Sequence, residues 1–215
     1  YVPYQKPEEF IYTHRPAPAA QRKNKDLQAW RKSYAARMAQ YQTSREETLP
    51  LSPSALAGEE TENRQAADLG TLVHAALAHY WQGEEDLPVC LARAARETAL
   101  AQYTDAAREI LDMFLASDAC ARLRAMQVLD AEIPFSRQTP QGVVSGVMDL
   151  LLRDTDGTVW VVDFKTDRTD DPAQLAEKYR PQLQAYVQAA QQMYSQNAVH
   201  GAAVLVRAGR LAELA

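Results

Sequence analysis

The chain is poor in cysteine and has no long apolar run. Its two cysteines, Cys90 and Cys120, stand far apart and lack the paired spacing of a zinc or iron–sulfur site. Isolated cysteines suit a reducing cytosol, and we interpret both as small buried hydrophobic residues. No apolar run approaches the roughly 18 to 20 residues that would span a bilayer. No signal-peptide pattern opens the sequence. These absences predict a cytoplasmic protein without a membrane segment.

The sequence also lacks a phosphate-binding loop of the form G-x-x-x-x-G-K-[S/T], so the chain carries no nucleotide-driven motor of its own. Its formal net charge of −5 speaks weakly against a free-standing polyanion binder. The charge is uneven, however. Residues 1–45 hold nine Lys/Arg and three Asp/Glu, whereas the remainder holds 14 and 25. A basic segment on an acidic body can follow phosphates, and a solvated helix face explains the same pattern equally well.

Proline and apolar spacing divide the first half of the chain into helices. Residues 1–18 contain four of the 11 prolines and predict an extended arm. Residues 19–45 predict a helix with one apolar stripe beside a basic face. Ser52 and Pro53 are typical of a helix start, and this short helix should end near Gly58. Further helices are predicted for residues 63–82, with Gly83 as the stop, for 88–102, for 104–116 and, as a short piece, for 118–124.

After Met126 the pattern changes to strands. Alternating residues predict strands over 128–138, 142–154 and 158–166, and residues 155–157 turn the second into the third. A long amphipathic helix over 172–195 and a buried strand over 200–208 follow. We therefore predict an α/β fold with a mixed central sheet of four to five strands flanked by helices. Residues 1–48 would form an N-terminal arm and basic helical extension, and residues 49–215 the main domain.

Charged residues interrupt the two strands on either side of the predicted turn. Asp163 and Lys165 are two residues apart and so project from one face of a strand. Asp149 lies about as far before the turn as Asp163 lies after it, which places the two carboxylates nearly opposite. Opposed like charges destabilise a plain sheet, but a divalent cation between them would bind both, and carboxylates are preferred ligands of Mg²⁺ and Mn²⁺. An exposed ion pair at a strand end is the alternative for Asp163 and Lys165 alone.

Five motifs together resemble the RecB/AddA branch of the PD-(D/E)xK nuclease superfamily. They are LGTLVHAAL with Gly70 and His74, DAEIPFS with Glu132, GVMDLLL with Asp149, VVDFKTD with Asp163 and Lys165, and YRPQLQAYVQAA with Gln182 and Tyr186. They occur in the order of that branch and span residues 70–186. Their joint occurrence is far more specific than any one of them.

The resemblance implies a restriction-endonuclease-like core and metal-dependent hydrolysis of DNA. It implies His74, Asp149, Asp163 and the backbone carbonyl of Phe164 as ligands of Mg²⁺ or Mn²⁺, and Lys165 as the catalytic lysine. Leu69, Leu72, Val73 and Leu77 should bury the helix of His74 and press its imidazole into the site, although a lone helical histidine is otherwise a core residue. Glu132 would touch the metal through water or hold Lys165, and a solvent-facing strand residue is its alternative.

The same resemblance implies contacts to the nucleic acid. Gln182 and Tyr186 are four residues apart, hence on one helix face. The glutamine offers amide donors to a phosphate or a water, and the tyrosine a hydroxyl or a stacking ring. We also count both among the catalytic residues. Thr166 could donate to a phosphate or simply close its strand, and Arg180 completes the predicted DNA-binding set.

The cysteine count narrows the resemblance within the branch. Branch members with an iron–sulfur cluster carry four cysteines, so this chain builds none. That favours the nuclease domain at the C-terminus of an AddA- or RecB-like helicase, as do the missing start methionine and the proline-rich arm. We expect a single DNA strand, the helicase portion of the same polypeptide and a partner subunit of an AddAB/RecBCD-like complex as partners. The setting would be exonucleolytic processing of double-strand breaks in bacteria. A stand-alone nuclease, a decayed binding or assembly module, and binding by the basic N-terminal helix remain alternatives.

Overall fold

The computed structural model describes residues 64–83, 86–139, 142–169 and 171–214. The predicted arm over 1–18, the basic helix over 19–45 and the short helix at Ser52 lie outside these residues. The N-terminal helical extension and its boundary at residue 48 therefore stay predictions.

The described residues form helices first and the sheet afterwards, as the sequence predicts. The helices are α3 (Arg64–Trp81), α4 (Leu87–Thr98), the 3₁₀ helix η2 (Ala101–Tyr103), α5 (Thr104–Leu115), α6 (Asp118–Arg124) and α7 (Pro172–Met193). The strands are β1 (Gln127–Thr139), β2 (Gly142–Arg153), β3 (Val159–Lys165), β4 (Val199–Leu205) and β5 (Arg210–Glu213). Within these ranges no helix is long and apolar enough to cross a membrane.

Local sequence signals explain where the helices begin and end. Gly83 follows α3 with φ at 74° and donates its N–H to the Tyr80 carbonyl at 3.1 Å, as its predicted role as a stop requires. The predicted helix over 88–102 is divided, because Ala99 takes a left-handed φ of 57° and ends α4 at Thr98. Asp171 caps α7 by accepting backbone hydrogen bonds from the first turn.

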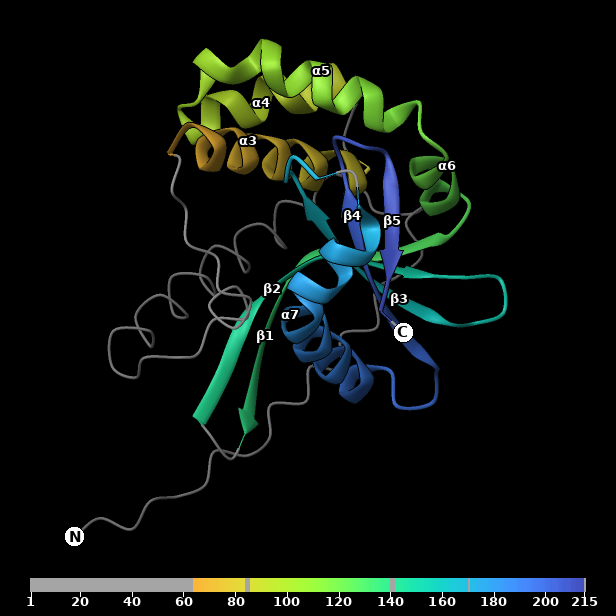
Figure 1. Ribbon diagram of the computed structural model, residues 1–215. Helices are drawn as coiled ribbons and strands as arrows, with labels where there is room; N and C mark the ends of the chain where they lie inside the picture. Colours follow the sequence, from red (N-terminus) through yellow and green to blue (C-terminus); the bar gives the residue numbers. More distant parts are fainter. Residues whose placement is uncertain (1–63, 84–85, 140–141, 170, 215) are drawn as a thin grey trace, which may run out of the picture. The chain divides into compact units, whose positions relative to one another are not determined.

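The five strands form one mixed sheet in the order β1-β2-β3-β4-β5 (Figure 1). The pairs β1–β2, β2–β3 and β4–β5 are antiparallel, and β3–β4 is parallel because α7 connects them. The predicted α/β fold class is thus confirmed. The strand predicted over 200–208 ends at Leu205, since the chain turns there and returns as β5, which the sequence pattern did not predict.

Helices cover both faces of this sheet (Figure 1). Helices α3, α4, α5 and α6 pack through buried leucines and Phe114 against side chains such as Leu150, Val162 and Phe164. Helix α7 packs against the opposite face, where Tyr186 and Leu183 meet side chains such as Val161 and Ala203. Alternate residues of β3 therefore enter two different cores, and all seven residues of this strand are buried.

We predict that Gly201→Ala destabilises the fold. Gly201 lies on β4 beneath α7, and an added Cβ would stand 2.9 Å from Cγ2 of Val187. Overpacking of this kind costs about 1–3 kcal/mol. The midpoint of urea unfolding should therefore fall, whereas Gln196→Ala at an exposed position should leave it unchanged. An unaltered midpoint for Gly201→Ala would show that α7 has room to move.

Candidate active site

Strands β2 and β3 stop pairing beside a group of charged side chains. Their register ends with Leu150 opposite Val162, so the next position on each strand is Asp149 and Asp163. Phe164 donates its N–H to Oδ2 of Asp149 at 2.8 Å. The two carboxylates thus come to the same end of the hairpin, as its predicted register requires.

Asp163 and Lys165 form a buried ion pair on the face of β3 that α7 covers. Lys165 Nζ lies 3.1 Å from Asp163 Oδ2, and the two side chains are 9% and 3% exposed. The alternative of an ordinary exposed pair is therefore wrong. Burying two charges costs several kcal/mol each before their attraction is counted, so such a pair is weak evidence of stabilisation and stronger evidence of a function.

His74 reaches the carboxylates from α3. Its Nδ1 lies 3.3 Å from Asp149 Oδ2, and its side chain is 32% exposed. Leu72, Val73 and Leu77 are fully buried, as predicted, whereas Leu69 is only partly buried. Burial alone would lower the pKa of His74, but the charge of Asp149 and a hydrogen bond to it raise the pKa from 6.5 to about 9.

Glu132 faces the same carboxylates from β1 in a strained conformation. Its neighbours pair with Leu150 and Met148, which places it across from Asp149, and its φ of 54° is uncommon for a residue other than glycine. Burial, and then the charge of Asp149, raise the pKa of Glu132 from 4.5 to about 7. The solvent-facing alternative does not describe this half-buried side chain.

The two aspartates respond to this setting in opposite directions. Burial, and then repulsion from Asp149, raise the pKa of Asp163 to about 6, although Lys165 partly offsets the shift. Burial would also raise the pKa of Asp149, but His74 and the Phe164 N–H lower it below its usual value. The negatively charged form is therefore favoured at Asp149, whereas it is disfavoured at Asp163 and Glu132.

The donor types suit a divalent cation, although the side chains are not arranged around one. Among the described residues, no three His, Cys, Asp or Glu side chains converge as a metal-binding group. His74 contacts Asp149, whereas Asp163 contacts Lys165 instead. A cation would remove the repulsion that raises the pKa of two of the carboxyl groups. The ligand roles of His74, Asp149, Asp163 and the Phe164 carbonyl therefore stay predictions.

Gln182 and Tyr186 lie on one face of α7, as predicted. Gln182 Nε2 donates to the Tyr186 hydroxyl at 3.0 Å, and both side chains are buried. The Tyr186 ring packs edge-on against Phe135 of β1, with 5.5 Å between the ring centroids. A ring enclosed in this way cannot stack on a base, so only the predicted hydrogen-bonding roles fit the geometry.

The remaining predicted residues lie around the end of β3. Thr166 is half-buried, and a Cβ added to Gly70 would stand 2.9 Å from its Oγ1. The glycine of the predicted motif therefore allows α3 to approach the segment after Lys165. Arg180 donates from Nε to Glu177 Oε2 at 2.9 Å on the outer side of α7.

One residue beside the site was not predicted from the sequence. The buried ring of Tyr179 lies between two ammonium groups, with Lys165 Nζ at 4.1 Å and Lys178 Nζ at 4.7 Å from its centroid. Its hydroxyl donates to the carboxylate of Asp167 at 3.0 Å. Tyr179 precedes Gln182 by three positions, so the helical period could have placed it on the same face.

Comparisons with known proteins agree with the predicted family. The profile of the family described as the PD-(D/E)XK nuclease superfamily matches residues 17–213. An ATP-dependent helicase/nuclease subunit of Acetivibrio thermocellus is 28% identical over 153 residues, which cover 61% of this chain and 12% of the relative. Proteins of the same name from Lacticaseibacillus casei and Lacticaseibacillus paracasei are 29% identical over 102 residues, 41% of this chain and 8% of each relative. The chain thus spans a small fraction of these relatives.

We predict that stability falls as the pH rises from 5 to 8. Glu132, Asp163 and His74 all have a raised folded-state pKa, so each contributes stability that is complete below its unfolded pKa. That contribution is lost as the pH passes through the folded values of about 7, about 6 and about 9. Asp149 has a lowered pKa, so its contribution to stability changes with pH in the opposite direction and is lost only in acid.

Urea unfolding at a series of pH values measures this loss. Glu132→Gln removes one titrating group and should make the fall between pH 5 and 8 smaller. Glu109→Gln on the exposed face of α5 is the matched control and should leave the fall unchanged. Identical pH profiles for the protein and Glu132→Gln would contradict the electrostatic interpretation.

Proposed function

The chain belongs to the PD-(D/E)XK nuclease superfamily, and on that basis we propose that it is a Mg²⁺- or Mn²⁺-dependent deoxyribonuclease that hydrolyses phosphodiester bonds. Family membership supports hydrolysis of nucleic acid in general. The observation that carries the finer proposal is the buried Asp163–Lys165 pair at the point where β2 and β3 part beside Asp149.

In this proposal one set of residues binds the metal and another contacts the substrate. His74, Asp149 and Asp163, with the carbonyl of Phe164, would hold the cation. A bound divalent cation supplies Lewis-acid polarisation of a phosphate oxygen and a lower pKa for bound water. Glu132 stands next to Asp149 and would accept a hydrogen bond from a water there, since its carboxyl group is held close by the turn of the backbone.

Lys165 carries the central catalytic role. Its ammonium group would hold the attacking water by a hydrogen bond and offset the negative charge that develops on the phosphate oxygens. The ring of Tyr179 supports the ammonium group from behind, and Asp167 fixes that ring through its hydroxyl. A lysine held in this way loses little freedom on substrate binding, which favours catalysis.

We propose that the DNA enters as a single strand and is contacted through its backbone. The Gln182 amide, with the Tyr186 hydroxyl that it binds, would contact the strand from α7. Thr166 and Arg180 would donate to phosphates at its edge. Contacts of this kind carry no sequence information, so cleavage should be largely independent of sequence.

The wider setting follows from the named relatives. We infer that the domain acts together with a helicase portion and a partner subunit of an AddAB/RecBCD-like complex, in the bacterial cytoplasm. Its task there would be exonucleolytic processing of DNA double-strand breaks for recombinational repair. The naming of the relatives as ATP-dependent helicase/nuclease subunits supports this inference.

Two rival functions rest on specific features. A catalytically decayed binding or assembly module would retain the fold, but decay usually removes a ligand first, and His74, Asp149, Asp163 and Lys165 are all present. Nucleic-acid binding by the basic segment over 1–45 would need no active site at all. A stand-alone nuclease shares the proposed chemistry and differs only in its partners.

Alanine substitution tests the enzymatic proposal. Asp163→Ala and Lys165→Ala should each lower kcat at least about 100-fold on labelled single-stranded DNA, because each removes a group that acts on the charge of the reacting phosphate. Asp112→Ala on α5 is the control and should cleave normally. Chelation of divalent cations should abolish cleavage, and circular substrates reveal any endonucleolytic capacity. Full activity of Asp163→Ala, or no cleavage by the protein with either metal, would refute the proposal.

Deletion of residues 1–48 separates the nuclease from the binding module. We expect the shortened chain to retain cleavage and to bind DNA more weakly, because the basic segment adds phosphate contacts but no catalytic group. Circular dichroism checks that the domain remains folded. Loss of all DNA binding and cleavage in a folded shortened chain would favour the basic segment as the functional part.

A further inference from the structure

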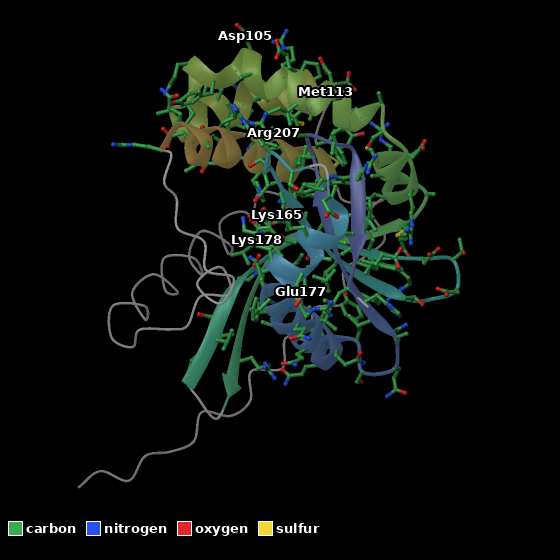
Figure 2. The ribbon with its side chains drawn as sticks, viewed as in Figure 1. Asp105, Met113, Lys165, Glu177, Lys178 and Arg207 are labelled. Atoms are coloured by element: carbon green, nitrogen blue, oxygen red, sulfur yellow. The ribbon has the colours of Figure 1, made fainter. Side chains whose placement is uncertain are left out.

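A second cationic group lies beside the catalytic lysine. Arg207 follows β4 in the turn to β5, where Val206 donates its N–H to the Lys165 carbonyl at 2.9 Å. Arg207 itself donates from Nε to the Thr166 carbonyl at 2.8 Å. Its guanidinium group is thereby attached to the residue that follows Lys165, and Figure 2 labels Arg207 above Lys165 in the view.

The turn that carries Arg207 packs against the start of α6. Gly209 has a left-handed φ of 60°, and an added Cβ would stand 2.4 Å from Cβ of Ser117. Ser117 in turn caps α6 by accepting the N–H of Cys120 at 3.2 Å. The turn is therefore packed against a helix start as well as joined to two strands, which holds Arg207 in a defined place.

Arg168 lies in the segment between β3 and α7. The residues on either side of Arg168 both form hydrogen bonds. The Asp167 carboxylate accepts from Lys178 Nζ at 2.7 Å and from the Tyr179 hydroxyl. The Thr169 hydroxyl accepts the N–H of Asp171 at 3.3 Å. Arg168 is exposed, so its guanidinium group faces solvent from a well-held backbone.

Both arginines lie at the segment after β3, since Arg207 is bonded to the Thr166 carbonyl and Arg168 follows Thr166 by two residues. Burial, and then the positive charge of Arg168, lower the pKa of Arg207. Neither arginine forms an ion pair with a carboxylate in the described part of the chain. Two like charges brought together without a counter-charge destabilise the free protein, and a bound anion would remove that cost.

We propose that Arg207 and Arg168, together with the Thr166 hydroxyl, bind the backbone phosphate next to the one that is cut. The C-terminal ends of the parallel strands β3 and β4 form this edge, where open α/β sheets bind ligands. A guanidinium fork matches the oxygens of a phosphate and can bind two at once. Thr166 has no hydrogen-bond partner for its hydroxyl among the described residues, so this donor is available.

This inference rests on the proposed function, because Lys165 defines where the reacting phosphate lies. It adds a second anchor a short distance along the same strand. Two phosphate contacts fix the direction of the backbone through the site, whereas a single contact allows it to rotate. The site would then position a strand without reading its bases, in keeping with sequence-independent cleavage.

Binding measured without cleavage tests the proposal. A fluorescently labelled single-stranded oligonucleotide of mixed sequence is titrated in chelator over a range of NaCl concentrations. Arg207→Ala and Arg168→Ala should each weaken binding about tenfold, as expected for the loss of a charge-assisted hydrogen bond. The slope of log affinity against log salt should become shallower by about 0.7 for each lost phosphate contact.

The control is Arg108→Ala, which removes the same charge from the exposed face of α5 and should leave the slope unchanged. Arg168→Ala also guards against a folding artefact, because Arg168 holds no backbone carbonyl, and circular dichroism checks both variants. Affinities and slopes for Arg207→Ala and Arg168→Ala that match Arg108→Ala would overturn the proposal, as would the absence of any binding by the unaltered protein.

The outcome also distinguishes this site from the nuclease proposal. Weaker binding in both variants of a protein that cleaves with neither metal would support the phosphate site and refute the catalytic proposal. Normal binding by both variants of an active nuclease would refute the phosphate site alone.

Discussion

The arrangement of the whole domain depends on a negative charge that must be buried at the end of β3. Asp163 lies in a strand whose every residue is buried, and Lys165 pairs with its carboxylate at 3.1 Å. Removing both charges from water costs free energy, so the packing of the two surrounding cores must stabilise the fold enough to keep the pair buried. The helices on one face and α7 on the other provide that packing. The stability of the packed cores thus offsets the unfavourable free energy of the buried charges at the site.

Other residues around the site also have features that lower the stability of the free protein. Glu132 has a left-handed backbone, and both it and Asp163 have a raised carboxyl pKa. The left-handed backbone costs free energy through strain. The raised pKa values show that a negative charge at either carboxyl group is unfavourable in the protein alone, and a nearby positive charge would offset that cost. At the same sheet edge, burial and then the positive charge of Arg168 lower the pKa of Arg207, and the proposed phosphate would offset that repulsion. A cation on one side and a phosphate strand on the other would satisfy both groups.

Much of this arrangement could be predicted from the sequence, and the failures have physical reasons. The hairpin register and the two-residue spacing of Asp163 and Lys165 follow from strand geometry alone, and so were predictable. The left-handed Glu132 was not, because no local residue preference favours it and only the neighbouring strand imposes it. The helical period places Tyr179 on the face of Gln182, but its contact with Lys165 depends on tertiary packing, as does the return of the chain as β5, and neither was predictable.

The central proposal is that Asp149 and Asp163 would share one divalent cation. Titration of Mn²⁺ into the protein, followed by the electron paramagnetic resonance signal of free Mn²⁺, measures this most directly. We expect saturable binding that is lost in Asp149→Ala and in Asp163→Ala and retained in Asp112→Ala. Equal Mn²⁺ binding by the protein and by both site variants would contradict the account.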